Sequence, residues 1–406
     1  MPVPSVLLVT VSAEGDCAAE YYEVEDRVKK YVQLQHKWFP DVIKIEKIYN
    51  HTLQQQYMET SLKLNDSMHE VKLFHGTSAD AAEKIIEHGF KLPQRTGMFG
   101  RGIYFATDSS KSAQDIYTKD SNLLLLCDVK LGRCKTVEKD KTDMDGGTLK
   151  SLGYDSLYAK RGTREKGGVQ FDEYVIYNPA QAVVRYVVHY QRLAIPKQLS
   201  ETFGFFGTEK EFKTYELQAK RGSEMSDEAH DTHFRIAESQ FLRLCQVRNL
   251  SRSITEVHYF VNPPLLEKFR AKGETFVKQY GKSIKSEYIP AWHGTKEENI
   301  EKIVRENFRL DKLSASTGDR GWYGAGIYFS EFPDVSLHYG SRLLLCMVLP
   351  GRSYDAKRSD RSLLEGKPCK VGYDSHRVEA DKEGRGEELV IFNPDQILPC
   401  YVVSYK

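Results

Sequence analysis

Residues 98–117 read MFGRGIYFATDSSKSAQDIY, and residues 321–340 read GWYGAGIYFSEFPDVSLHYG. In both stretches a glycine and one further residue precede GIYF, and a serine and a tyrosine follow some positions later. A β-strand by itself does not need this detail, because strand formation asks mainly for β-branched, aromatic or alternating residues. The near-repetition therefore indicates that a larger unit is duplicated in the chain.

The duplication extends through the rest of the sequence in the same order. The matched segments are IYNHTLQQQY (48–57) with FVNPPLLEKF (260–269), FHGTSADAAEKIIEHGF (74–90) with WHGTKEENIEKIVRENF (292–308), LLLLCDVKLG (123–132) with LLLCMVLPG (343–351), and DEYVIYNPAQ (172–181) with EELVIFNPDQ (387–396). A chain of 406 residues is also long enough for about two domains. We therefore expect domains at 1–192 and 229–406, joined by a linker at 193–228, which has no counterpart.

Each copy combines helical and strand patterns. The segment after HGT has apolar residues at helical spacing, and Gly89 is a plausible stop for that helix. YVIYN, RYVVHY, LVIFN and CYVVSY are rich in β-branched and aromatic residues, which is typical of strands. Many strands with helices grouped outside them predict an α+β domain.

Composition limits the classes of function. The net charge is +1 and no basic block occurs, so nucleic-acid binding is not indicated. Seven scattered cysteines without a CxxC motif suit a reducing, intracellular location, cytoplasmic or nuclear. VLLVTV near the N-terminus is too short for a signal peptide and predicts a buried strand, and no apolar run reaches the ~20 residues of a membrane span.

His75 and His293 each follow an aromatic residue and precede Gly-Thr, between an expected strand and an expected helix. A single histidine in such a place is more often structural than functional. The next residue, Gly76 or Gly294, lets a ligand approach the backbone closely, where an N–H and a C=O can hold an amide.

Tyrosines recur at matched positions beside these histidines. Tyr104 and Tyr328 belong to GIYF, and Tyr117 and Tyr339 follow one short helix later. Two tyrosines so placed could enclose a flat ring. The alternative for any one of them is core packing with its hydroxyl satisfied.

Glu173 and Glu388 each enter an otherwise apolar strand five residues before an asparagine. A charged residue there is costly unless it has a partner or a task. Asp172 and Glu387 precede them, but adjacent strand residues point to opposite faces, and the shared spacing to asparagine selects Glu173 and Glu388. An isolated glutamate at a strand edge is usually solvated, whereas His, Tyr and Glu recurring together indicate a site.

Together these motifs resemble the catalytic domain of the poly(ADP-ribose) polymerases, within the diphtheria-toxin-like ADP-ribosyltransferases, over roughly residues 19–192 and 229–406. The resemblance implies two tandem domains, each with a split antiparallel β core flanked by helices. It also implies that NAD is consumed as a substrate, without a metal, and that ADP-ribose passes to protein acceptors, including the chain itself.

The resemblance also assigns roles to residues. The expected catalytic residues are His75, Tyr104, Glu173, His293, Tyr328 and Glu388. The residues expected to bind NAD through its nicotinamide are Gly76, Ser112, Tyr117, Gly294, Ser336 and Tyr339. In these roles the histidines and glutamates would bond ribose hydroxyls, and each glutamate would stabilise the cation that develops as nicotinamide leaves.

Several alternatives stay open from the sequence. The chain could transfer single ADP-ribose units or build chains, and the longer spacing from Tyr104 to Tyr117 is similar to that of mono-transferring branches. An NAD glycohydrolase is one rival function, and a pair of NAD- or ADP-ribose-binding modules acting as a scaffold, with one or both copies inactive, is another. His230 and His233 share a helix face but lack a third ligand, so no metal site is expected.

Overall fold

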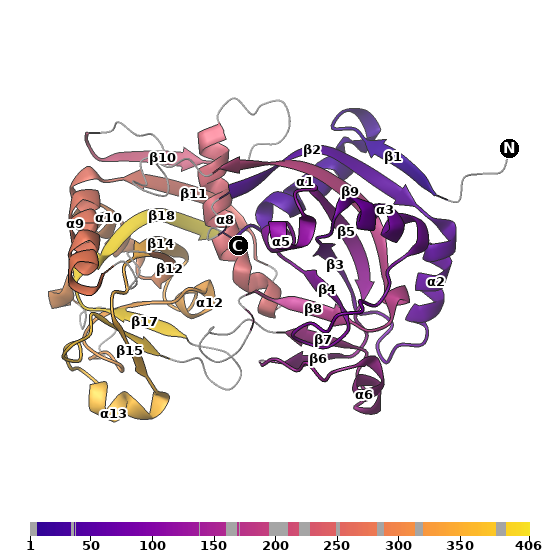
Figure 1. Cartoon of the computed structure of the whole chain (residues 1–406). Helices are drawn as coiled ribbons and strands as arrows, with labels where there is room; N and C mark the ends of the chain where they lie inside the picture. Colours follow the sequence, from indigo (N-terminus) through magenta and orange to yellow (C-terminus); the bar gives the residue numbers. More distant parts are fainter. Residues whose placement is uncertain are drawn as a thin grey trace. The chain divides into compact units, whose positions relative to one another are not determined.

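A computed structural model describes residues 6–33, 36, 38–137, 139–159, 169, 171–194, 210–218, 228–248, 252–281, 288–312, 320–378 and 387–406. The chain divides into two compact units, Met1–Ile195 (unit 1) and Pro196–Lys406 (unit 2) (Figure 1). No helix within the described ranges is long and apolar enough to span a bilayer.

Unit 1 is built on a nine-stranded sheet in the order β1-β2-β9-β5-β3-β4-β8-β7-β6. Its pairings are antiparallel except that of β6 with β7. The strands are β1 (Leu7–Val11), β2 (Trp38–Tyr49), β3 (Glu70–His75), β4 (Ile103–Ala106), β5 (Leu123–Lys130), β6 (Cys134–Val137), β7 (Ser156–Ala159), β8 (Glu173–Ile176) and β9 (Ala182–Ala194). The helices are η1 (Gly15–Cys17), α1 (Ala18–Lys30), α2 (His51–Ser61), α3 (Ala79–His88), α4 (Ser109–Ser112), α5 (Asp115–Thr118), α6 (Gly146–Ser151) and η4 (Pro179–Gln181).

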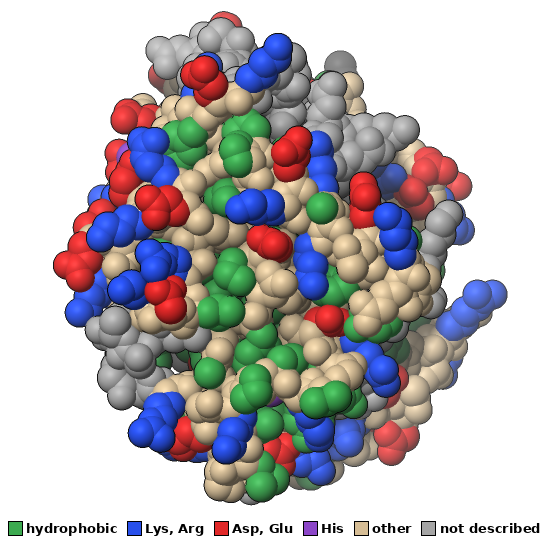
Figure 2. Space-filling model, turned by 90° about the vertical axis from the view of Figure 1, so that its left-hand side faces the viewer, with side chains coloured by type: hydrophobic (Ala, Val, Ile, Leu, Met, Phe, Trp, Pro, Cys, Tyr) green, Lys and Arg blue, Asp and Glu red, His purple; other side chains and the backbone are tan. Residues whose placement is uncertain are grey.

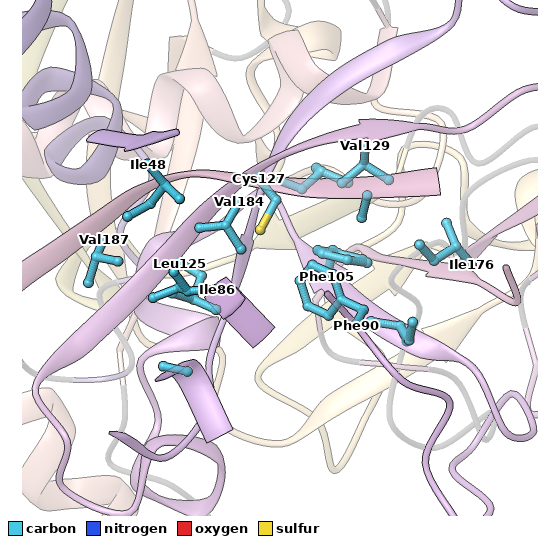
Figure 3. Packing of buried hydrophobic residues seen from close by; sticks show 14 of the residues in the cluster. Ile48, Ile86, Phe90, Phe105, Leu125, Cys127, Val129, Ile176, Val184 and Val187 are labelled. Carbon is cyan, nitrogen blue, oxygen red and sulfur yellow. The ribbon is translucent and has the colours of Figure 1, made fainter. Parts of the chain in front are cut away.

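The apolar run of β5 is buried on both faces of this sheet. Leu125 and Cys127 pack in one cluster with Ile86 of α3, together with Phe90 and Phe105 (Figure 3). The alternate residues of β5, Leu124 and Leu126, pack in a second cluster with Val24 and Val28 of α1. Because successive strand residues point to opposite faces, α3 and α1 cover opposite faces of the sheet.

Unit 2 repeats the same strand order in two sheets. The five-stranded sheet is β10-β11-β18-β14-β12, and the four-stranded sheet is β13-β17-β16-β15. The strands are β10 (Lys213–Leu217), β11 (Ile254–Val261), β12 (Ile289–Gly294), β13 (Ile327–Phe329), β14 (Arg342–Val348), β15 (Ser353–Ala356), β16 (Ser375–Val378), β17 (Glu388–Ile391) and β18 (Ile397–Tyr405). The helices are α8 (Glu228–Arg248), α9 (Pro263–Tyr280), α10 (Glu297–Glu306), η6 (Leu310–Lys312), α12 (Pro333–Ser336), η7 (Arg358–Asp360), α13 (Arg361–Leu364) and η8 (Pro394–Gln396).

The join between the two halves of each core is narrow. In unit 1, β3 and β4 share the single pair Phe74–Ala106, and in unit 2 the halves meet at an isolated bridge between Trp292 and Ser330. The α+β class is confirmed, with each core split at the same place and only β6–β7 and β15–β16 parallel. This split lies beside the predicted histidines.

Two repeated asparagines have structural tasks in both units. Asn50 caps α2 by accepting from Leu53 N and donates to Ile86 O at 3.0 Å, which ties α2 to α3. Asn262 makes the same connections in unit 2, accepting from Leu265 N and donating to Val304 O. These asparagines therefore recur for structural reasons and are not evidence of a functional site.

Two expectations differ from the structure. Residues 213–217, within the expected linker 193–228, form β10, which pairs with β11 through backbone hydrogen bonds and so extends the sheet of unit 2. Most of the remaining linker lies outside the described residues. The VLLVTV segment does form a strand, but it is not buried, because β1 is an edge strand and Leu7 and Leu8 are 49% and 45% exposed.

Candidate active site

A histidine lies at the end of the strand that borders the split in each unit. His75 Nδ1 is 2.9 Å from the backbone oxygen of Tyr104, and His293 Nδ1 is 2.8 Å from that of Tyr328. A carbonyl oxygen only accepts, so Nδ1 carries the proton and Nε2 is left as an acceptor. Burial lowers the pKa of both histidines, that of His293 to about 4. Each imidazole is therefore neutral at pH 7, and its Nε2 can accept a hydrogen bond from a hydroxyl group.

Two phenylalanine rings pack against each imidazole and restrict its orientation. The centroid of Phe90 lies 5.2 Å from that of His75 in an edge-on arrangement, and Phe105 lies 5.5 Å away. In unit 2 the matching distances from His293 are 4.8 Å to Phe308 and 5.5 Å to Phe329. The second residue of each pair is the Phe of GIYF, so that motif positions the histidine from both its backbone and its side chain.

The tyrosine of GIYF uses its hydroxyl to hold the preceding turn. Tyr104 accepts from Phe99 N at 2.8 Å and donates to Gly100 O at 3.0 Å. Tyr328 makes the same pair of bonds, to Tyr323 N and Gly324 O, at 2.8 and 2.9 Å. Burial raises the pKa of Tyr104 to about 12, so its hydroxyl stays protonated. The predicted role of these rings beside nicotinamide stays a prediction.

Strand register brings Glu173 to the same region. Phe74 pairs with Ala106, which pairs with Glu173, so β3, β4 and β8 present these residues in one row across the split. His75 is the next residue after Phe74. In unit 2 the pairing of Phe329 with Leu389 sets Glu388 at the matching place. The histidine, tyrosine and glutamate of each unit therefore lie on neighbouring strands.

Lys111 joins this group in unit 1 and was missed by the sequence analysis. Its Nζ lies 2.9 Å from Glu173 Oε1, and the two side chains are only 9% and 11% exposed. The same Nζ donates to the Tyr117 hydroxyl at 2.9 Å. Burial disfavours the Lys111 ammonium, but Glu173 and Tyr117 outweigh it, and the Lys111 pKa is raised. Its charge also lowers the pKa of His75.

The glycine after each histidine is required by protein packing. A Cβ on Gly76 would lie 1.7 Å from the backbone oxygen of Ser112, and one on Gly294 would lie 2.2 Å from that of Ser336. Ser112 Oγ in turn donates to Phe74 O at 3.1 Å. The absence of a side chain on Gly76 thus lets α4 dock on β3. The sequence did not indicate this packing requirement. The binding of the nicotinamide carboxamide by these glycines and serines stays a prediction.

The second tyrosine of each unit is more exposed than the first. Tyr117 is 40% exposed and Tyr339 is 53% exposed. Lys111 Nζ lies 4.2 Å from the centroid of the Tyr117 ring, and Tyr339 borders Gly294. Both rings are partly exposed close to the residues named above, and their stacking on nicotinamide stays a prediction.

The charges around the glutamate differ between the units. Val335 precedes Ser336 where Lys111 precedes Ser112, so unit 2 has no lysine at that position of the described helix α12. Instead, Arg377 of β16 donates to Glu331 Oε1 and to Glu387 Oε1, both at 3.1 Å. In unit 2, Arg377 thus bonds to the residue before Glu388.

The twelve predicted site residues therefore fall at equivalent places of two equivalent units, next to the split in each core. Lys111 was missed because a lysine between serines in a polar segment is usually solvated. No signal in the sequence singled it out, because the matched position in the second copy is Val335. Within the described ranges no three His, Cys, Asp or Glu residues are grouped to hold a metal ion.

Comparison with known proteins gives a family match over most of the chain. The family model described as the poly(ADP-ribose) polymerase catalytic domain matches residues 18–192 and, separately, residues 233–406. The two matches correspond to the two copies described above.

Individual relatives match one domain's length. Poly [ADP-ribose] polymerase 2 of Zea mays is 27% identical over 197 residues, covering 40% of this chain and 30% of the relative. Poly [ADP-ribose] polymerase 2 of Homo sapiens is 28% identical over 158 residues, covering 31% and 27%. Protein mono-ADP-ribosyltransferase PARP4 of Mus musculus is 33% identical over 132 residues, covering 29% and 7%. The chain thus spans less than a third of each of these relatives.

Proposed function

The chain belongs to the poly(ADP-ribose) polymerase catalytic domain family, and from this premise we propose that it transfers ADP-ribose from NAD to protein acceptors, itself included, and releases nicotinamide. One observation carries the proposal: both units hold a neutral histidine by the same bond to the backbone of the GIYF tyrosine. A duplicated bond of this kind beside a duplicated glutamate is expected when two sites perform the same reaction.

The residues support a specific division of tasks. Nε2 of His75 or His293 accepts a hydrogen bond from a ribose hydroxyl, because Nδ1 is already donating to a carbonyl. The carboxylate of Glu173 or Glu388 binds the 2′-hydroxyl of the nicotinamide ribose. As the bond to nicotinamide breaks, positive charge grows on the sugar, and a fixed carboxylate stabilises it.

Lys111 adds a positioning role in unit 1. Its ammonium lies 2.9 Å from Glu173, and this contact orients the carboxylate where both side chains are nearly buried. The Tyr117 hydroxyl shares the same ammonium, which places the stacking ring and the carboxylate on one anchor. NAD acts here as a consumed substrate.

A binding-only role for unit 1 is the second candidate. The observation that favours it is the same ion pair, because the Lys111 ammonium offsets part of the charge that Glu173 would offer to a developing cation. In that case unit 1 would hold NAD or ADP-ribose as a scaffold and unit 2 would perform the transfer.

The test is incubation of the whole chain with labelled NAD, followed by gel and mass analysis. Glu173→Gln and Glu388→Gln are compared singly and together, with the neighbouring carboxylates altered as Asp172→Asn and Glu387→Gln as matched controls. Loss of one stabilising carboxylate should lower the transfer rate about a hundredfold in the affected unit, so that only the double variant loses labelling.

The products separate the remaining candidates. One adduct per acceptor indicates mono-transfer, a ladder indicates chain building, and free ADP-ribose alone indicates hydrolysis. Labelling that survives in the double glutamine variant would refute the assignment of the two glutamates. Labelling lost with Glu388→Gln alone would assign unit 1 to binding.

A further inference from the structure

The surface of unit 2 beside the GIYF turn is rich in exposed cations. Between residues 352 and 370 the chain has six basic and three acidic residues, a net charge of +3. All six basic side chains are exposed: Arg352, Lys357, Arg358, Arg361, Lys367 and Lys370. We call these residues, with Trp322, Tyr354 and Tyr373, the basic–aromatic surface. Figure 2 shows this side of unit 2, with lysine and arginine side chains among hydrophobic ones towards its lower edge.

Aromatic rings are stacked with these cations. The guanidinium of Arg361 lies 3.7 Å from the centroid of the Trp322 ring, and the ammonium of Lys370 lies 3.7 Å from that of Tyr354. Arg352 lies 5.2 Å from the ring of Tyr373. Trp322 itself is 46% exposed, which is unusual for so large an apolar ring.

Backbone bonds make this one continuous surface. Gly366 N donates to Gly321 O at 2.9 Å, and Ala325 N donates to Lys367 O at 2.7 Å, so the Trp322 turn is fixed beside α13. The Tyr354 and Tyr373 rings are in contact, with centroids 5.3 Å apart. The Trp322 turn is therefore fixed beside α13, and Arg361 and Lys370 lie against aromatic rings.

The matching part of unit 1 does not have this character. Met98 stands where unit 2 has Trp322, and residues 133–151 carry five basic and four acidic residues, a net charge of +1. Among the described residues there, Tyr154 is the ring that stacks with cations, Arg133 at 5.1 Å and Lys135 at 4.8 Å. The surface therefore does not follow from the fold that the two copies share, which argues for a task specific to unit 2.

We propose that the basic–aromatic surface binds single-stranded nucleic acid. Exposed cations pair with phosphates, and an exposed indole beside a guanidinium stacks with an unpaired base. A duplex hides its base faces, so it fits the stacked residues less well than a single strand. The overall net charge of +1 conceals this local excess. The inference does not depend on the proposed transferase activity.

The test measures binding of the whole chain to a fluorescent single-stranded oligonucleotide of about 12 residues, at several salt concentrations. Trp322→Ala should weaken binding at least about fivefold, because one base–aromatic stack is lost. The variant Arg361→Ala/Lys370→Ala should reduce the slope of log affinity against log salt by about 1.4. The matched control, Lys139→Ala/Lys141→Ala in unit 1, removes the same charge and should change neither quantity.

Four results would overturn the proposal. They are the absence of salt-dependent binding by the unaltered chain, equal affinity of Trp322→Ala, equal affinity for the same sequence as a duplex, and binding of ADP-ribose polymer but not of the oligonucleotide. Thermal unfolding is followed for each variant. If Trp322→Ala does not fold, the salt slope of the Arg361→Ala/Lys370→Ala variant decides the question.

Discussion

Replacing Lys111 with methionine should destabilise unit 1 and leave unit 2 unchanged. The substitution keeps most of the side-chain volume but leaves the Glu173 carboxylate, whose side chain is 11% exposed, without the ammonium that lies 2.9 Å from it. Removing one partner of a buried ion pair costs about 3 kcal/mol in free energy of unfolding or more, because the remaining charge is buried without compensation. The bond from Lys111 to Tyr117 is lost as well.

Hydrogen exchange followed by mass spectrometry places this effect in the chain. Amides of β8, Glu173–Ile176, should exchange about a hundredfold faster, whereas amides of β17, Glu388–Ile391, should keep their rates. The exposed Lys84 of α3 offers a matched control, since Lys84→Met should alter stability by less than about 0.5 kcal/mol.

A double-mutant cycle tests whether Lys111 and Glu173 are energetically coupled. If the pair is coupled, Lys111→Met/Glu173→Gln should be less destabilised than the sum of the two single variants, by about 2 kcal/mol, because no buried charge is left alone. Costs that add to within about 0.5 kcal/mol would show that the two side chains do not interact and would refute the argument.

Gly76→Ala should lower the melting temperature, because the new Cβ would lie 1.7 Å from Ser112 O. Gly273→Ala should raise it, because Gly273 is inside helix α9 and its new Cβ would meet Leu349 Cδ1 at an ordinary 3.6 Å. Equal effects of the two substitutions in calorimetry would contradict this. Arg377→Met should lower the free energy of unfolding of unit 2 by about 2 kcal/mol, read from hydrogen exchange of β17, since two carboxylates each lose the bond from this guanidinium. For His293, the folded pKa of about 4 lies below the unfolded value near 6.5, so the unfolded state binds more protons between these values. Its contribution to stability is therefore complete above about pH 6.5 and is lost as the pH falls towards 4; denaturation midpoints that rise on acidification over this range would contradict the burial of a neutral ring.

Local signals in the sequence predicted the elements around the site well. Gly89 ends α3 with a positive φ of 81°, as expected from its place after the apolar face of that helix. In unit 2, Asn307 takes the same place with a φ of 73°. The α+β class also followed from the sequence, because helical and strand periodicities differ over only a few residues.

The residues of the site could be named because they are repeated. His75, Tyr104 and Glu173 would each be an ordinary structural residue alone, and their recurrence in order as His293, Tyr328 and Glu388 separates them from chance. Lys111 has no such counterpart, since Val335 stands at the matched position. Repetition therefore could not reveal it, and its pairing with Glu173 emerged only from the folded chain.

The sequence by itself determined that the protein is a duplicated α+β chain, and it marked one histidine, two tyrosines and one glutamate in each copy as candidate site residues. Tertiary structure alone decided how those residues are held: the tautomer of each histidine, the docking of Ser112 against Gly76, and the choice of Lys111 in one copy and Arg377 in the other as the cation beside the glutamate strand. The physical reason is that a repeat is written in residue identities along the chain, whereas hydrogen bonds, close approaches and ion pairs form between segments that are distant in sequence and meet only when strands such as β3, β4 and β8 pair.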